Sequence, residues 1–465
     1  MLFTSTAFLV LLAVTFVAYY LLPRRSGQVG LLICASLVFY AWNFPLLLLL
    51  LIASILTNWG ITYGILSAPD PRRRKAFATL GVVLNLSILA FFKYSPLIGE
   101  TFFPEASAIG DFLLAIPLPI GISFFTFQGI SLVVDTFRGK ELKLAAATDR
   151  PLGLLANIAF YLAFFPQLIA GPIVKAHDFL PQIRRKFLRD IDWETAFRYI
   201  VTGYFLKMVI ADNLKDYTYW MSYPWFQNLS AIDLLTLLLG YSVQIFADFA
   251  GYSLIAIGIA RLFGYVLMDN FDFPYIAKSF SDFWRRWHIS LSTFLKEYLY
   301  FPLGGNQHGA FKTYRNLLLT MVLGGLWHGA AWSYAVWGAY HGMALALERL
   351  ARDRGFRPLP YLWLRRLWVF GVVTVGWLLF RLPEFSHVVL YLQKIFTNKP
   401  IGNLERVGLV LVYCLPVVIY HLGYLYLDKE KPAYRSVLQP LAYGLMIFLI
   451  FTNAGSSGDF IYFQF

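Results

Sequence analysis

The chain has 465 residues, of which 58% are hydrophobic and only 14% are charged. A soluble domain carries charge on about a quarter of its residues, so this composition excludes an ordinary soluble protein and indicates an integral membrane protein. The 39 basic and 26 acidic residues leave a net charge of +13. In a membrane protein this excess predicts basic loops on the cytoplasmic side, and we expect no nucleic-acid partner.

Apolar runs follow one another along the chain. The first begins at Leu2 with no basic region before it and no small-residue cleavage site before Arg24, so we expect a retained span, not a signal peptide. Runs that reach or approach the roughly 20 residues of a membrane-spanning helix follow at 29–51, 76–92, 234–246 extended through 259, 367–380 and 407–427. The pattern predicts about 11 to 13 apolar segments in all. Cys34 and Cys414 lie inside such runs and predict neither a disulfide framework nor a metal site.

The polar stretches between these runs are short. The longest, 175–193, cannot fold alone, and no repeat of fixed period is present, so residues 1–465 are expected to form a single polytopic membrane domain. Pro and Gly interrupt several segments, at 117–121, 166–172, 302–305 and 324–325, which suggests a compact bundle around an internal cavity. Basic clusters lie at 24–25, 72–75, 184–189, 349–357 with 365–366, and 429–435. The first two are expected to face the cytoplasm, with the N-terminus outside.

The stretch SDFWRRWHISLSTFLKEYLY, which begins at residue 281, threads charged residues among aromatic ones. On a continuous helix, Arg285, His288 and Ser292 fall at i, i+3 and i+7 on one face. Asp282 lies one turn before both arginines, and because Arg285 shares the face of His288 we assign Arg286 to a structural pair with Asp282 and Arg285 to an anionic ligand. Two interpretations stay open: an amphipathic interfacial helix, and a polar helix that enters a cavity.

His328 lies inside the apolar run LTMVLGGLWHGAAWSYAVWGAYHG. A lone buried histidine is more often a packed core residue, but an ionisable group in a membrane span is costly and therefore a functional candidate. Desolvation disfavours the imidazolium, so this histidine would be neutral at pH 7, as a general base must be. On a continuous helix His341 would face away from it. Gly324 and Gly325 would let another helix or a substrate approach closely.

Gln244 and Asp248 share one face of an apolar segment at i and i+4. Asp248 must pair or face water, and a structural pair and a substrate contact are both open. Motifs of zinc proteases, P-loop proteins and dinucleotide-binding proteins are absent from the sequence. Of the four other histidines, only His387 has an acidic residue, Glu384, at helical ligand spacing, so no metal site is expected.

Together these residues resemble the membrane-bound O-acyltransferase (MBOAT) family. FWRRWHISLSTFLKEYLYFPLGGN and NLLLTMVLGGLWHGAAWSYAVWGAYHG look like its two signature regions, in the bacterial alginate O-acetyltransferase-like subgroup. Further typical segments, in order, are LPIGISFFTFQGISLVVDTFRG, FFPQLIAGPIVKAHDFLPQI, QIFADFAGYS, GWLLFRLPEF and the terminal FIYFQF. Two departures are Leu254, where many alginate-type members have an acidic residue, and Lys296–Glu297 in place of Arg–Asp. The first leaves the acceptor polymer open.

The resemblance implies an all-α bundle of about 11 transmembrane helices with re-entrant helices around a central tunnel. His328 matches the family's catalytic histidine, the expected general base, and His288 matches its second histidine-or-asparagine position. Candidate contacts of the donor or substrate among the residues above are Arg285, Trp327, Gln244, Asp248 and Ser292.

The resemblance also implies an acetyl thioester donor, acetyl-CoA, arriving from the cytoplasm as a co-substrate, with no permanently bound cofactor. It implies an SGNH-type extracytoplasmic acetyltransferase as partner, a polysaccharide acceptor, contact with membrane lipids, and a multi-pass location in the bacterial inner membrane. Alginate, peptidoglycan and cellulose remain open as acceptors. An alternative is a polysaccharide or lipid-linked sugar transporter, in which buried His, Asp and Arg line a conduction path. A scaffold for an export complex is a third reading.

Overall fold

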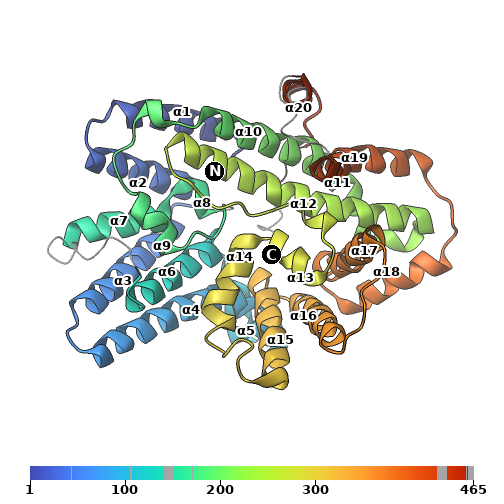
Figure 1. The fold of residues 1–465 in the computed structure, drawn as a ribbon, viewed down its shortest axis with the longest axis horizontal. Coiled ribbons are helices and arrows are strands. Elements are labelled where there is room, and N and C mark those ends of the chain that lie inside the picture. Colours follow the sequence, from blue (N-terminus) through green and yellow to red (C-terminus); the bar gives the residue numbers. More distant parts are fainter. Residues whose placement is uncertain are drawn as a thin grey trace. The chain divides into compact units, whose positions relative to one another are not determined.

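The computed structural model describes residues 1–42, 44–104, 107–140, 151–169, 171–426, 437–456 and 458, and all regular elements in this part are helical (Figure 1). In chain order they are α1 (Thr6–Leu21), α2 (Arg25–Ala41), α3 (Leu47–Ser67), α4 (Pro71–Phe102), α5 (Ala108–Leu114), α6 (Ile122–Phe137), α7 (Pro151–Ala163), α8 (Phe165–Leu168), α9 (Ala176–Phe179), η2 (Leu180–Gln182), η3 (Leu188–Asp190), α10 (Trp193–Tyr204), η4 (Phe205–Ala211), α11 (Asp212–Thr218), η5 (Tyr219–Met221), η6 (Trp225–Asn228), α12 (Ala231–Leu262), η7 (Pro274–Ile276), α13 (Phe280–Arg286), α14 (Ile289–Leu295), η8 (Lys296–Tyr300), α15 (Gly309–His328), α16 (Trp332–Asp353), α17 (Leu362–Arg381), α18 (Phe385–Thr397), α19 (Leu404–Tyr426) and α20 (Gln439–Thr452). The predicted all-α class is confirmed for the described residues.

Five helices in the described part are long and apolar enough to cross a membrane: α3, α4, α12, α17 and α19. The predicted runs at 76–92, 234–259 and 367–380 lie within α4, α12 and α17, and the run at 407–427 lies in α19 up to residue 426. The run at 29–51 was predicted as one span, and this is wrong. α2 ends at Ala41 and α3 begins at Leu47, because Pro45 lacks a backbone donor and disfavours helix at the residue before it.

The chain forms two compact units: Met1–Ile200 with Leu254–Met268, and Val201–Ser253 with Asp269–Phe465. Each is described by itself below. That residues 1–465 make a single membrane domain stays a prediction. The terminal FIYFQF segment and the basic cluster at 429–435 lie outside the described residues.

In the first unit, small and polar side chains bring α3, α4 and α6 into close contact. A Cβ on Gly81 of α4 would lie 2.7 Å from Ile61 of α3, so the glycine permits this approach. The side-chain amides of Asn58 and Asn85 bond each other across the same interface, at 3.0 and 3.3 Å. Close packing at glycine and polar bonds between helices are the contacts that hold helices together in a membrane, where lipid is as apolar as leucine.

The predicted interruption at 117–121 is confirmed: α6 begins directly after Gly121, whose φ is +78°. The glycines at 304 and 305 also have positive φ, of 100° and 54°, and lie in the turn before α15. Gly324 and Gly325 do not interrupt a helix, contrary to the prediction. α15 runs through them and ends at His328.

Candidate active site

The signature stretch of the second unit is two short helices with a break between them (Figure 1). Ser279 caps α13 by accepting from Asp282 N at 3.0 Å, and the Glu348 carboxylate of α16 accepts from Phe280 N at 2.6 Å and from Ser281 N at 3.3 Å. These acceptors satisfy backbone donors that the start of a helix leaves open. α13 ends at Arg286, and α14 begins at Ile289.

His288 stands in this break with φ 44° and ψ 55°. It is one of two non-glycine residues with positive φ in the part of the chain that the structure describes. Left-handed backbone costs such a residue of order 1–3 kcal/mol and persists only where the surroundings enforce it. The conformation lets His288 lie fully buried.

Arg285 and His288 therefore do not share a helix face, and the continuous-helix expectation for this stretch is wrong. The Arg285 side chain is 69% exposed and its Nη2 lies 3.7 Å from Asp282 Oδ1. Arg286 makes the closer contacts, with Nε 3.1 Å from Asp282 Oδ1 and Nη1 3.0 Å from Asp272 Oδ2. Ser292, also placed on the shared face, donates to the Trp287 carbonyl at 3.2 Å.

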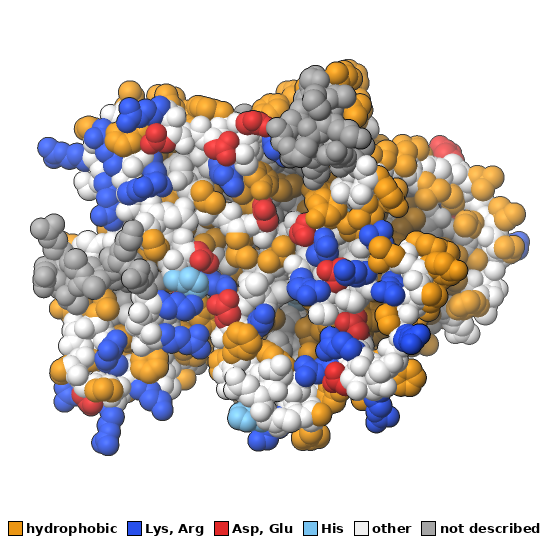
Figure 2. All heavy atoms as spheres, viewed as in Figure 1, with side chains coloured by type: hydrophobic (Ala, Val, Ile, Leu, Met, Phe, Trp, Pro, Cys, Tyr) orange, Lys and Arg blue, Asp and Glu red, His pale blue; other side chains and the backbone are white. Residues whose placement is uncertain are grey.

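Lys and Arg side chains gather on the face where α13, α16 and α17 lie (Figure 2). Two arginine side chains of this unit, Arg285 on α13 and Arg352 on α16, are largely exposed, at 69% and 67%. The basic groups at the end of α16 were expected from the cluster at 349–357. An exposed guanidinium on a basic face is suited to hold an anionic ligand.

Asn270 holds the His288 ring. Its Oδ1 accepts from Ser290 N at 3.3 Å and from Ser290 Oγ at 2.8 Å, and lies 3.1 Å from His288 Nδ1. A backbone N–H only donates, so the atom facing Ser290 is the amide oxygen, and His288 Nδ1 must carry the proton it donates. The amide nitrogen donates to Ser253 Oγ at 3.0 Å. In the neutral ring the Nε2 lone pair is then the one that accepts.

His328 is the last residue of α15 and is 3% exposed. Its ring centroid lies 6.3 Å from that of His288, and Trp327 contacts both, at 5.9 Å from His288 and 5.1 Å from His328. Phe380 of α17 and Trp337 of α16 close other sides, at 5.4 and 5.2 Å. Two histidines 40 positions apart in the sequence thus form one buried, aromatic-walled pair, which periodicity alone could not place together.

The indole of Trp337 contacts both His341 and His328. The expectation that they face apart on a continuous helix does not apply, because Gly329–Ala331 separate α15 from α16. Trp337 lies between them, 4.9 Å from His341 and 5.2 Å from His328.

The two helices pack side by side (Figure 1) through glycine, as predicted for Gly325. A Cβ on Gly325 would lie 2.2 Å from the Tyr334 carbonyl oxygen, and a Cβ on Gly338 would lie 2.3 Å from that of Met321. A larger residue at either position would push α16 away from α15. The glycines therefore set the distance at which Trp337 meets His328.

Gln244 and Asp248 both lie buried on α12. Gln244 Oε1 accepts from Thr218 Oγ1. Asp248 Oδ1 lies 2.7 Å from Nζ of Lys207, so the carboxylate is paired, as a charge in a membrane span requires. Their roles as substrate contacts stay predictions.

Sequence reasoning missed two residues of this region, Lys207 and Asn270. Lys207 is 1% exposed and also lies 2.7 Å from Asp212 Oδ1. The signal was present, because FLKMVIA is an apolar run with a single charge. Asn270 gave no comparable signal, since it lies in a polar loop after α12.

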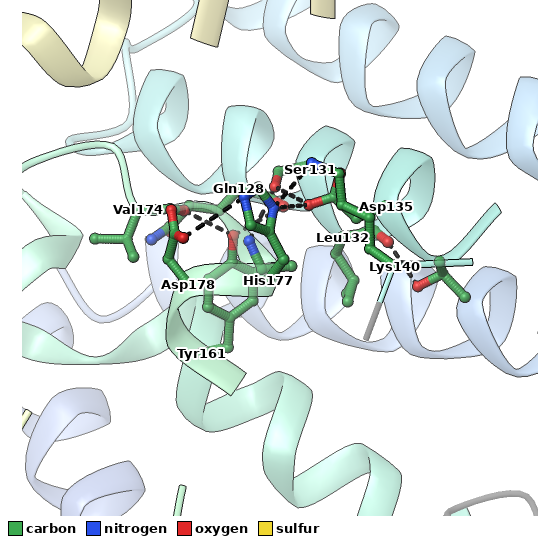
Figure 3. Close-up of polar contacts among 11 residues, drawn as sticks. Gln128, Ser131, Leu132, Asp135, Lys140, Tyr161, Val174, His177 and Asp178 are labelled. Atoms are coloured by element: carbon green, nitrogen blue, oxygen red, sulfur yellow. Dashed lines mark hydrogen bonds and ion pairs between the residues drawn. The ribbon is translucent and has the colours of Figure 1, made fainter. Parts of the chain in front are cut away.

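A second polar cluster lies in the first unit (Figure 3). Asp135 of α6 is fully buried, and its Oδ2 lies 2.6 Å from His177 Nδ1 while its Oδ1 lies 3.2 Å from Lys140 Nζ. Ser131 Oγ donates to the same carboxylate at 3.3 Å. His177 had no acidic residue at helical spacing in the sequence, and tertiary packing supplied one. Among the described residues, no three His, Cys, Asp or Glu side chains form a metal-binding group.

The histidine pair is the part of this site that is suited to chemistry. The His288 ring is oriented by the Asn270 amide and keeps a lone pair on Nε2, and His328 lies beside it at the end of α15. A neutral imidazole can accept the proton of an attacking hydroxyl, and aromatic walls exclude the water that would compete. Such a pair is suited to acid–base chemistry at a buried site of the second unit.

The family model described as MBOAT, membrane-bound O-acyltransferase family, matches residues 80–382. The chain belongs to this family and is a membrane-bound O-acyltransferase. The resemblance seen in the sequence and the prediction of an acyltransferase are confirmed.

Three relatives show the range of related enzymes. The chain is 40% identical to "Probable alginate O-acetylase AlgI" of Azotobacter vinelandii over 82% of this chain and 75% of that protein. It is 36% identical to the peptidoglycan O-acetyltransferase of Helicobacter pylori over 78% and 72%. It is 29% identical to the teichoic acid D-alanyltransferase of Bacillus subtilis over 49% and 58%.

Proposed function

We propose that the protein moves an acetyl group from a cytoplasmic thioester, acetyl-CoA, across the membrane for O-acetylation of an extracytoplasmic polysaccharide, with His328 as general base. The observation that carries this proposal is the buried pair of His288 and His328, whose ring centroids are 6.3 Å apart. Both lie in the second unit, in the two segments that resemble the family's signature regions.

The proposed step is a direct acyl transfer. An acceptor hydroxyl oxygen attacks the thioester carbonyl carbon while His328 takes the hydroxyl proton. A carbon–oxygen bond forms, the carbon–sulfur bond breaks, and the proton passes to the leaving thiolate, which gives an ester and a free thiol. His288, with Nδ1–H held by Asn270, keeps Nε2 as the acceptor and helps to orient the reacting groups.

The membrane supplies the reason for a buried site. The donor is charged and stays on one side, while the acceptor lies on the other, so the reaction must take place within the membrane. The proposed bundle has about 11 spans with re-entrant helices around a tunnel. α13 and α14 support the re-entrant part, because seven residues each are too few to cross a bilayer.

Arg285 is the proposed donor contact, on the strength of its exposure, because an exposed guanidinium can bind an anion bidentately. The proposed location is the bacterial inner membrane, and the proposed partner is an SGNH-type extracytoplasmic acetyltransferase that completes transfer to the polymer. Relatives named for alginate and for peptidoglycan support a polysaccharide as the final acceptor.

The test compares two single-histidine variants in cells that export the polymer. His328→Ala should abolish acetylation of the polymer, because losing a positioned general base usually costs about 10²–10⁴-fold in rate. His387→Ala is the matched control, because this histidine stacks on Tyr223 and pairs with Glu384, and neither of these contacts involves His288 or His328. Normal membrane abundance with wild-type acetylation in His328→Ala would refute the proposal.

A further inference from the structure

A short segment after α20 is seated on the helix that contains η4. We call Asn453–Ser456 together with Gly458 the strap. Gly455 N donates to the Met208 carbonyl at 2.9 Å, and Asn213 Nδ2 donates to the Asn453 carbonyl at 2.9 Å. Ser456 Oγ bonds the Asp216 carboxylate at 3.2 and 3.3 Å. All of these residues belong to the second unit.

The helix is wound more loosely where the strap binds. η4 is a π-helical turn, in which the Asp212 N–H reaches back five residues to the Lys207 carbonyl. This longer bond shifts the hydrogen-bond register, and the strap's Gly455 N–H meets the next carbonyl, Met208. π-helical turns occur mostly as single insertions at functional sites.

Lys207 connects the strap to α12. Its buried ammonium lies 2.7 Å from Asp212 Oδ1 and 2.7 Å from Asp248 Oδ1, and donates to the Gly458 carbonyl at 3.2 Å. An ammonium has three protons and no acceptor, so these three oxygens satisfy it completely. One side chain thus bonds its own helix, α12 and the strap.

The strap needs glycine at its centre. A Cβ on Gly455 would lie 2.6 Å from the Asp212 carbonyl carbon and 2.6 Å from Asn213 N. Both are backbone atoms that cannot turn aside. A side chain here would therefore force the strap off the helix.

Through α12, the contacts of Lys207 also affect the surroundings of His288. Asp248, which Lys207 holds, is followed on α12 by Phe249, and the Phe249 ring lies 4.6 Å from the His288 ring, edge to face. Ser253, one turn later, accepts from Asn270. A shift of α12 at Asp248 would move two of the groups that position His288.

We propose that Lys207 is a positioning residue of acyl transfer, which docks the strap on η4 and holds α12 in register against His288. The proposal rests on the proposed roles of His288 and His328. It predicts that releasing the strap slows the chemical step while donor binding stays intact.

Docking is measured first, without reference to activity. Asp216→Cys and Ser456→Cys, in a background with Cys34 and Cys414 changed to serine, should form a disulfide on mild oxidation. Adding Gly455→Ala should lower the yield, because overpacking of this kind shifts an equilibrium by roughly five- to 150-fold. Gly444→Ala in α20 is the control, since a Cβ there has open space among the described residues.

Activity is measured next, with the single variants in the otherwise native chain. Gly455→Ala and Lys207→Met should lower kcat of acyl transfer at least about tenfold with the donor KM within about twofold, whereas Lys207→Arg should restore part of kcat. Gly444→Ala should match wild type in both. Full activity in Gly455→Ala with a lost disulfide would overturn the proposal, as would an undiminished disulfide. A strap that docks in a protein without any acyl transfer would instead count against the proposed function.

Discussion

Asn270 is the group whose removal tests most directly how the site is built. In Asn270→Ala, the Nδ1–H of His288 and the N–H of Ser290 lose the one oxygen that both use. The Ser290 N–H is fixed by the backbone, whereas His288 Nδ1 can turn to Ser290 Oγ, which lies 3.4 Å away. A buried donor left without a partner costs about 1–3 kcal/mol, and exchanging the Asn270 oxygen for this longer contact adds to that cost.

Part of this cost falls on catalysis, because the ring of His288 is no longer oriented. If about 2 kcal/mol is lost from the transition state, kcat/KM falls about thirtyfold. The assay is thiol release from the acetyl donor by purified protein with an acceptor present. Membrane abundance and thermal unfolding of the same variant show how much of the cost falls on folding.

Ser253→Ala is the matched control. It removes only the acceptor of the Asn270 amide nitrogen and leaves the bond to His288 in place. Its rate should fall by less than about fivefold, which corresponds to about 1 kcal/mol. Equal losses in the two variants, or a wild-type rate in Asn270→Ala, would show that the amide does not set the orientation of His288.

Three further predictions concern the same chain. His288→Asn should fold better than His288→Ala and keep more activity, because asparagine tolerates left-handed backbone and can still bond Asn270; equal thermal stability of the two variants would contradict this. Arg285→Ala should raise the donor KM, and Arg285→Lys should also raise it if the contact is bidentate. Arg286→Ala should instead lower membrane abundance. An unchanged donor KM in Arg285→Ala would leave this side chain with an interfacial role. A cysteine at position 73, in a chain without Cys34 and Cys414, should be protected from an impermeant reagent outside intact cells, and labelling there would reverse the proposed orientation.

The class of the protein could be predicted from the sequence because membrane insertion depends on properties that add up along the chain. Long apolar runs and few charges mark spans wherever they pack, and this correctly located α4, α12 and α17. His328 was found for a related reason. An ionisable group inside such a run is costly, so it stands out before any contact is known.

The arrangement of the site depended on contacts that no local pattern contains. Helical periodicity placed Arg285 beside His288, but packing of α13 and α14 forces left-handed backbone at His288 and separates them. The oxygen that orients this ring comes from Asn270, and Lys207 meets Asp248 from another helix. Local spacing predicts which residues share one element, whereas the meeting of distant elements, and the strain that this meeting enforces, is decided only when the whole unit packs.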